Sequence, residues 1–187
     1  MEGIRTFSAF VNDSLIASGP LEAVLPALKT RFDSGAPDLV LVFEDQTGRQ
    51  MDFDLRGSLA EVLARVAPTP SRPGPGRPKL GVVSREISLL PRHWEWLEAQ
   101  PNGASAALRG LIEQASRQES PQQRSRRAME ATGRFLTAMA GNLPNYEEAS
   151  RALYRAARPR FEELSAIWPA DIRDHARRLA ASVWEQG

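Results

Sequence analysis

The chain of 187 residues contains no cysteine, only two histidines and only two lysines. The absence of cysteine excludes disulfides, thiol nucleophiles and thiolate metal sites, and it is compatible with a reducing compartment. No segment approaches the roughly 20 apolar residues that a membrane-spanning helix needs, and the N-terminus lacks the pattern of a secretory signal. We therefore expect a soluble, cytoplasmic protein without a membrane partner.

Recognisable catalytic patterns are also absent. The chain has no Walker phosphate loop, no GxSxG elbow and no HExxH helix. Asp171, Asp174 and His175 share one face of a predicted helix, a pattern that can bind a metal or hold a general base. Arg173 and Arg177 instead offer these carboxylates ordinary ion pairs, which favours a solvated, charged face.

A second group of carboxylates lies on or near predicted hairpin strands, where alternation turns side chains toward solvent. The group consists of Glu44, Asp45, Asp52 and Asp54. Neither group has the make-up of a catalytic or metal site. We therefore predict a protein that is not an enzyme, with no cofactor, no metal and no catalytic residue.

Positive charge is concentrated in the middle of the chain, although the net charge is only +1. Residues 1–67 contain 6 basic and 10 acidic side chains, residues 68–127 contain 10 and 5, and residues 128–187 contain 8 and 8. A local basic segment in a neutral protein is typical of a phosphate-binding surface. It is equally the composition of a solvated, arginine-rich linker.

The first third of the chain, residues 1–67, has the pattern of an α+β domain built from a duplicated hairpin and helix. Alternating or apolar strands precede an amphipathic helix in each copy, and Ser58 and Glu61 have the spacing of a capping box. The strands and helices are expected at 4–11, 14–17 and 21–32, and at 39–43, 51–55 and 58–66. We predict a four-stranded antiparallel sheet with both helices on one face.

Residues 68–79 are rich in proline and glycine and are predicted to be a linker. The linker ends in Gly76-Arg77-Pro78-Lys79, which resembles the core of an AT-hook. That resemblance implies that Arg77 and Lys79 reach the minor groove of A·T-rich DNA. The alternative is a solvated basic linker.

Residues 80–118 combine a short strand, a helix, a glycine turn and a second helix. In the strand, Ser84, Glu86 and Ser88 share one face, while Ile87 and Leu89 share the other. Trp94 and Leu97 have helical spacing, Pro101–Gly103 breaks that helix, and an apolar stripe resumes at Ala107, Leu108, Leu111 and Ile112. An element set of this size cannot enclose a core alone.

This order resembles ribbon-helix-helix DNA-binding proteins over about a fifth of the chain, in ISLLPRHWEWLE and GASAALRGLI. The resemblance implies that strands from two protomers pair antiparallel and enter the major groove. The resemblance implies base contacts from Ser84, Glu86 and Ser88, with the amides of Ala104, Ser105 and Ala106 on phosphate. We also expect Arg77 and Lys79 of the AT-hook-like arm, and Arg92, to lie near DNA. The implied dimer interface comprises Ile87, Leu89, Leu108 and Ile112. Glu86 stands where this family usually has a basic or neutral polar residue. Its carboxylate can accept a hydrogen bond from cytosine N4, but it also repels phosphate.

Trp94 and Trp96 cannot both face one core, because residues two apart on a helix diverge by roughly 200°. One of them is expected to meet a protein partner. Residues 119–187 are helical, with apolar stripes typical of a small bundle. The expected helices cover residues 128–139, 146–157, 161–168 and 169–184.

The whole chain also resembles an uncharacterised bacterial family of unknown function. The similarity lies in TFSAFVNDSLIASG, GRPKLGVVSREISLLPRHWEWL and FEELSAIWPADIRDHARRLA, in that order. It implies no activity. Two functions remain: a dimeric DNA-binding transcriptional regulator, or a dimerisation or protein-interaction module without nucleic acid.

Overall fold

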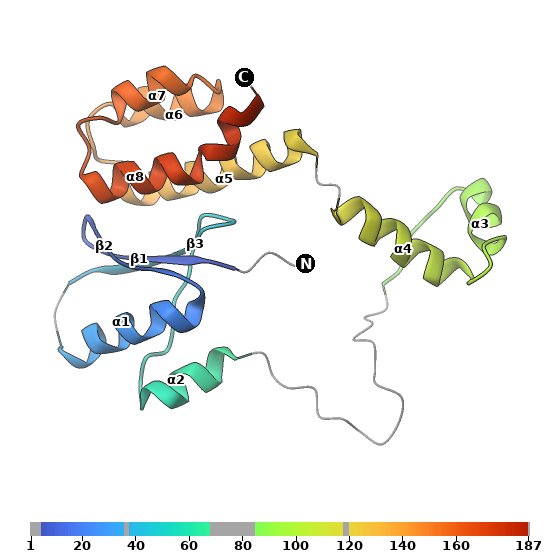
Figure 1. Ribbon diagram of the computed structural model, residues 1–187, viewed down its shortest axis with the longest axis horizontal. Helices are drawn as coiled ribbons and strands as arrows, with labels where there is room; N and C mark the ends of the chain where they lie inside the picture. The colour runs from blue at the N-terminus through green and yellow to red at the C-terminus, as the bar shows by residue number, and fades with distance from the viewer. Residues whose placement is uncertain (1–4, 36–37, 68–84, 118–119, 187) are drawn as a thin grey trace. The chain divides into compact units, whose positions relative to one another are not determined.

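The computed structural model describes residues 5–35, 38–67, 85–117 and 120–186. The chain divides into two compact units. Unit 1 comprises residues 1–67 and 120–187, and unit 2 comprises residues 68–119. The chain is mixed α+β, with four strands near its N-terminus followed by a mostly helical remainder (Figure 1). None of the helices in the described ranges has the length and hydrophobicity to cross a membrane.

Unit 1 is organised around a four-stranded antiparallel sheet, as predicted. Its strands are β1 (Phe7–Val11), β2 (Ser14–Gly19), β3 (Val40–Glu44) and β4 (Arg49–Gln50), in the order β2-β1-β3-β4. Ala9 of β1 pairs with Val42 of β3 at the centre of the sheet. The sequence FSAFV is buried along its whole length because both faces of β1 are covered.

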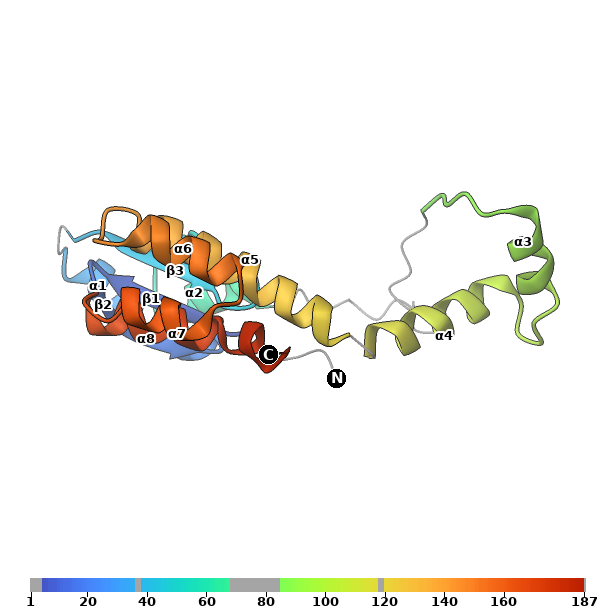
Figure 2. The ribbon, with the colours of Figure 1, turned by 90° about the horizontal axis from the view of Figure 1, so that it is seen from above.

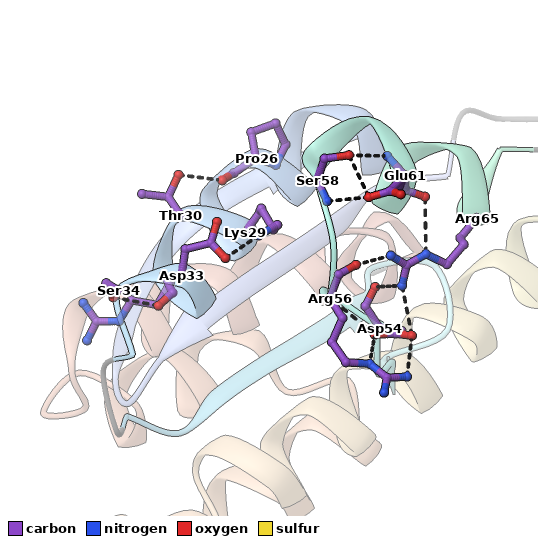
Figure 3. Close-up of polar contacts among 11 residues, drawn as sticks. Pro26, Lys29, Thr30, Asp33, Ser34, Asp54, Arg56, Ser58, Glu61 and Arg65 are labelled. Carbon is purple, nitrogen blue, oxygen red and sulfur yellow. Dashed lines mark hydrogen bonds and ion pairs between the residues drawn. The ribbon is translucent and has the colours of Figure 1, made fainter.

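Helices α1 (Leu21–Asp33) and α2 (Leu59–Val66) cover one face of this sheet (Figure 1). Their buried side chains pack with Phe7, Ala9 and Val42 from the strands. The predicted capping box is present at the start of α2, where Ser58 and Glu61 satisfy each other's backbone amides (Figure 3). This reciprocal cap explains why the helix begins at Leu59.

The opposite face is covered by helices from the C-terminal part of the chain (Figures 1 and 2). Helices α5 (Pro121–Met139) and α8 (Ala170–Leu179) lie next to the sheet (Figure 1). Helices α6 (Tyr146–Tyr154) and α7 (Arg158–Leu164) pack on their outer side, and a short 3-10 helix (Ala181–Gln186) packs against α5. Phe10 and Phe43 point from the strands into this layer, where each contacts Phe135 of α5. Residues 1–67 and 119–187 were predicted as separate domains, but residues 1–67 and 120–187 form one unit. The aromatic second face of the sheet is removed from water only because these helices cover it.

The second hairpin differs from its prediction. β4 contains only Arg49 and Gln50, whereas an alternating strand was expected over residues 51–55. The Met51 amide makes one further bond to the carbonyl of Val42, and the chain then leaves β3. Phe53 and Leu55 still pack into the core beneath α1 and α2. Alternation therefore identified the buried side chains correctly, but it did not identify the residues that pair with β3.

The turn between β3 and β4 lies directly against α5. Gly48 adopts φ +64° in this turn, and its Cα faces the backbone of Ala131. Arg134 of α5 donates from Nη1 to the carbonyl of Thr47 at 2.6 Å. The turn therefore needs glycine for two reasons: the left-handed backbone and the close approach of a helix.

Candidate nucleic-acid interface

Two helices make up the described part of unit 2. α3 (Pro91–Glu98) begins with a proline in its first turn, and α4 (Ala104–Arg117) follows a turn in which Gly103 has φ +73°. Pro91 suits this place because a first-turn amide has no helical acceptor. The residues before α3, from Arg85 to Leu90, have no regular secondary structure. The two helices and their glycine turn lie as the sequence predicts.

The apolar side chains of unit 2 are largely uncovered. Leu97 is the only buried residue of this unit within the part that the structure describes. The large exposed hydrophobic residues of the unit are Ile87, Leu90, Trp94, Trp96, Leu111 and Ile112. Monomeric proteins rarely leave so many large apolar side chains in water within one short segment, so we expect this unit to contain an interaction surface.

The residues predicted at the dimer interface follow this pattern. Ile87 and Ile112 are 55% and 64% exposed, and Leu89 and Leu108 are half-buried. No strand is formed by residues 85–90 in the single chain. A two-stranded ribbon gains its hydrogen bonds from a second protomer, so one chain alone lacks the partner that would define the strand. The ribbon itself stays a prediction.

The predicted DNA contacts divide into two groups. Arg77, Lys79 and Ser84 lie outside the described residues. Glu86 and Ser88 are exposed, as Arg92 is at the start of α3. The described contacts are thus accessible from solvent.

The predicted phosphate site at the start of α4 offers fewer amides than expected. The Ala106 amide donates to the carbonyl of Gly103 at 3.2 Å, so it is already used within the turn. The amides of Ala104 and Ser105 belong to the first helical turn, where no intrahelical acceptor exists. Ser105 is exposed and Ala104 is half-buried. Two amides, rather than three, are therefore oriented for an anion by the helix end.

Trp94 and Trp96 are 37% and 52% exposed, so neither ring has a complete packing environment in the single chain. They lie on different faces of α3, as their spacing requires. A single interface is therefore insufficient to cover both rings. Trp94 shares its helical face with the buried Leu97, whereas Trp96 projects away from it.

The chain matches one protein family over nearly its whole length. Residues 6–180 match the family described as "Uncharacterized protein conserved in bacteria (DUF2239)". The chain belongs to this family. No curated protein and no solved structure matches it. Membership of DUF2239 covers both units and confirms the predicted whole-chain resemblance.

The acidic and histidine groups of unit 1 in this DUF2239 protein do not form one site. Asp171 accepts from the backbone amide of Leu15 at 2.8 Å, and Asp174 pairs with Arg173 at 2.7 Å. His175 is buried rather than on the predicted solvated face. Among the described residues, no three histidine, aspartate or glutamate side chains are grouped to hold a metal.

The carboxylates of the second hairpin are also separated. Asp52 and Asp54 are exposed as predicted, but Glu44 and Asp45 are half-buried, because α5 and α8 cover this end of the sheet. Asp54 has two hydrogen bonds from the Arg56 guanidinium, at 2.8 and 2.9 Å, which hold the pKa of Asp54 well below its usual value. The Asp54 carboxylate therefore stays in an ion pair with Arg56 and is poorly suited to act as a general acid or base.

A shallow hollow of about 640 Å³ lies next to α2. Its lining includes Asp54, Arg56, Glu61 and Arg65, whose polar contacts are drawn in Figure 3. Arg65 donates to the carbonyls of Asp54 and Arg56, and it also pairs with the Asp54 carboxylate. These cations and anions neutralise one another, so the hollow has the character of a structural ion-pair cluster.

Unit 1 contains a polar cluster that was not predicted from the sequence, formed by Ser8, Asp45, His175 and Arg178. Its members come from β1, the β3–β4 turn and α8. Their separation along the chain left no local motif to recognise. The one available signal was that α8 contains a histidine one turn after Asp171 and three residues before an arginine.

Proposed function

We propose that this protein is a dimeric DNA-binding protein of ribbon-helix-helix type, acting as a transcriptional regulator. The observation that carries the proposal is the open apolar surface of unit 2. Two short helices around a single buried leucine have the order and size of one ribbon-helix-helix protomer without its partner. A second copy would cover Ile87, Leu108 and Ile112 with the same residues, as a two-fold symmetric interface does.

DNA recognition in this proposal uses the segment that precedes α3. Two copies of the segment pair antiparallel and place Ser84, Glu86 and Ser88 toward the bases of the major groove. The Glu86 carboxylate accepts from cytosine N4, which gives it a role despite its charge. Arg92 and the first-turn amides of α4 contact phosphates, which orient the dimer on the duplex.

The basic arm before this segment contributes affinity and a preference for the narrow minor groove of A·T-rich DNA, rather than contacts to base edges in the major groove. Arg77 and Lys79 lie at the end of the linker, close in sequence to the proposed ribbon. Arginine inserted in a narrow minor groove meets enhanced negative potential there. Each neutralised phosphate also releases counterions, which makes binding dependent on salt.

Replacing Arg77 and Lys79 together by alanine tests the contribution of DNA. Because two cations are lost per protomer, we expect DNA affinity at about 0.1 M salt to fall by roughly 10-fold or more. The log–log salt slope should become shallower by about 2 per protomer, provided that both side chains contact phosphate. Fluorescence anisotropy with random and A·T-rich duplexes measures both quantities.

The matched control replaces Arg151 and Arg155, two exposed arginines of unit 1, by alanine. This variant has the same change in net charge and should retain the wild-type slope. Equal effects of the two double variants would show that overall charge, rather than the arm, controls binding. Dimerisation without any DNA binding would favour the second candidate, a protein-interaction module, which Glu86 and the low net charge support.

A further inference from the structure

A chain of polar side chains runs from the exposed Arg178 of α8 inward to the buried His175 and the sheet of unit 1. Arg178 of α8 donates from Nη2 to Nδ1 of His175 at 2.5 Å and to the Ser8 hydroxyl of β1 at 3.3 Å. His175 Nε2 lies 3.7 Å from an Asp45 carboxylate oxygen in the β3–β4 turn. The His175 side chain is completely removed from solvent, and Ser8 is also buried. The cluster therefore links α8 to two parts of the sheet.

Aromatic rings surround the imidazole on its remaining sides. Its centroid lies 5.3 Å from that of Phe10 and 4.5 Å from that of Phe135. These two rings also contact each other and Phe43, so His175 lies at the centre of the contact between β1, β3, α5 and α8. A charge at this position cannot be solvated by water without opening the layer.

The hydrogen bonds define the protonation state of the ring. Nδ1 accepts from the Arg178 guanidinium, so the single proton of neutral imidazole is on Nε2, facing Asp45. Burial, together with the Arg178 charge, lowers the pKa of His175 to about 4, while Asp45 acts in the opposite direction. The neighbouring strands and α5 face the ring with Ser8, Phe10 and Phe135, which carry no charge.

We propose that protonation of His175 detaches α8 from the sheet, so that the Ser8–Asp45–His175–Arg178 cluster acts as an acid-sensitive switch. A second ring proton must occupy Nδ1, where it replaces the hydrogen bond from Arg178 with repulsion between two cations. Withdrawal of α8 relieves this repulsion by admitting water. It also exposes the aromatic face made by Phe10, Phe43 and Phe135.

The direction of the pH effect follows from the two states of α8. The ring is neutral when buried, and it regains the ordinary histidine pKa near 6.5 when exposed. The open form therefore binds the extra proton first as pH falls. The stability of the closed form is complete above about pH 6.5 and is lost between this pH and about pH 4. The full loss corresponds to a roughly 300-fold change in the closing equilibrium.

Hydrogen exchange of the full-length protein, read by mass spectrometry over residues 170–179, tests the switch. Between pH 7.5 and pH 4.5, we expect protection of α8 in the wild type to fall by about 70-fold, after correction for intrinsic exchange. His175→Gln keeps a polar side chain at this position that cannot take up a proton. Its loss over the same range should be at least about 10-fold smaller than that of the wild type.

Only one other histidine exists, which provides a matched control. His93 is exposed on α3, and His93→Gln should retain the wild-type pH dependence. Parallel loss of protection in the wild type and His175→Gln would overturn the proposal, because carboxylates would then account for the whole effect. Should His175→Gln not fold, proton NMR of the two histidine rings in the wild type gives the answer directly. A buried ring that becomes protonated above pH 6 while α8 stays protected would equally contradict the switch.

Discussion

Replacing Gly48 by alanine is expected to destabilise unit 1 by about 3 kcal/mol or more. A Cβ at this position would lie 2.7 and 2.8 Å from the carbonyl carbon and Cα of Ala131, and it would overlap the carbonyl oxygen. Those atoms belong to the backbone of α5, so they cannot rotate away as a side chain can. The left-handed backbone at φ +64° adds a cost of roughly 1–2 kcal/mol for any residue with a Cβ.

Urea denaturation followed by circular dichroism measures this effect. With a slope of about 2 kcal/mol per molar urea, the midpoint should fall by roughly 1.5 M. Gly35 provides the matched control, because it also has φ +64° in unit 1 but has no atom within 4 Å of the added Cβ. Gly35→Ala should therefore lose only the conformational cost. Equal losses at both positions would contradict the close packing of the turn on α5.

Replacing Ile112 by glutamate is expected to raise the dimer dissociation constant by at least about 100-fold. Ile112 is 64% exposed on α4 in the single chain, and it would be covered by the second copy in the proposed dimer. A charge buried there without a partner costs several kcal/mol in each of two symmetry-related places. In a monomer, the same surface substitution would change stability by roughly 0.5 kcal/mol or less.

Sedimentation equilibrium over a concentration series gives the dimer constant. Ile167→Glu is a close control, because Ile167 is 65% exposed but belongs to unit 1. This variant should associate like the wild type. A monomeric wild type, or equal association of Ile112→Glu and the wild type, would contradict the proposed use of the unit 2 surface.

Local sequence signals predicted the local structure well. The Ser58–Glu61 spacing identified the start of α2, and Gly103 identified the end of the turn before α4. Alternation located β1, and a short apolar run located β3. These features depend on residues within a few positions of one another, so the sequence contains the information directly.

The arrangement of the layers was harder to predict, because it depends on residues far apart in the chain. Phe10 and Phe43 were recognisable as apolar, but nothing local indicated that α5 would supply Phe135 to meet them. His175 has charged neighbours in the sequence and aromatic neighbours in the fold. The predicted division at residue 119 separated a sheet from the helices that complete its core.

Fluorescence anisotropy of the wild-type protein with random and A·T-rich duplexes across a salt series is the most direct test of DNA binding by the dimer. We expect binding at low salt that weakens steeply, by about 0.9 in log–log slope for each phosphate neutralised. Binding to the A·T-rich duplex should be tighter because of the basic arm. Absence of binding at low salt, with the protein folded and dimeric, would contradict the claim and leave unit 2 as a protein-interaction module.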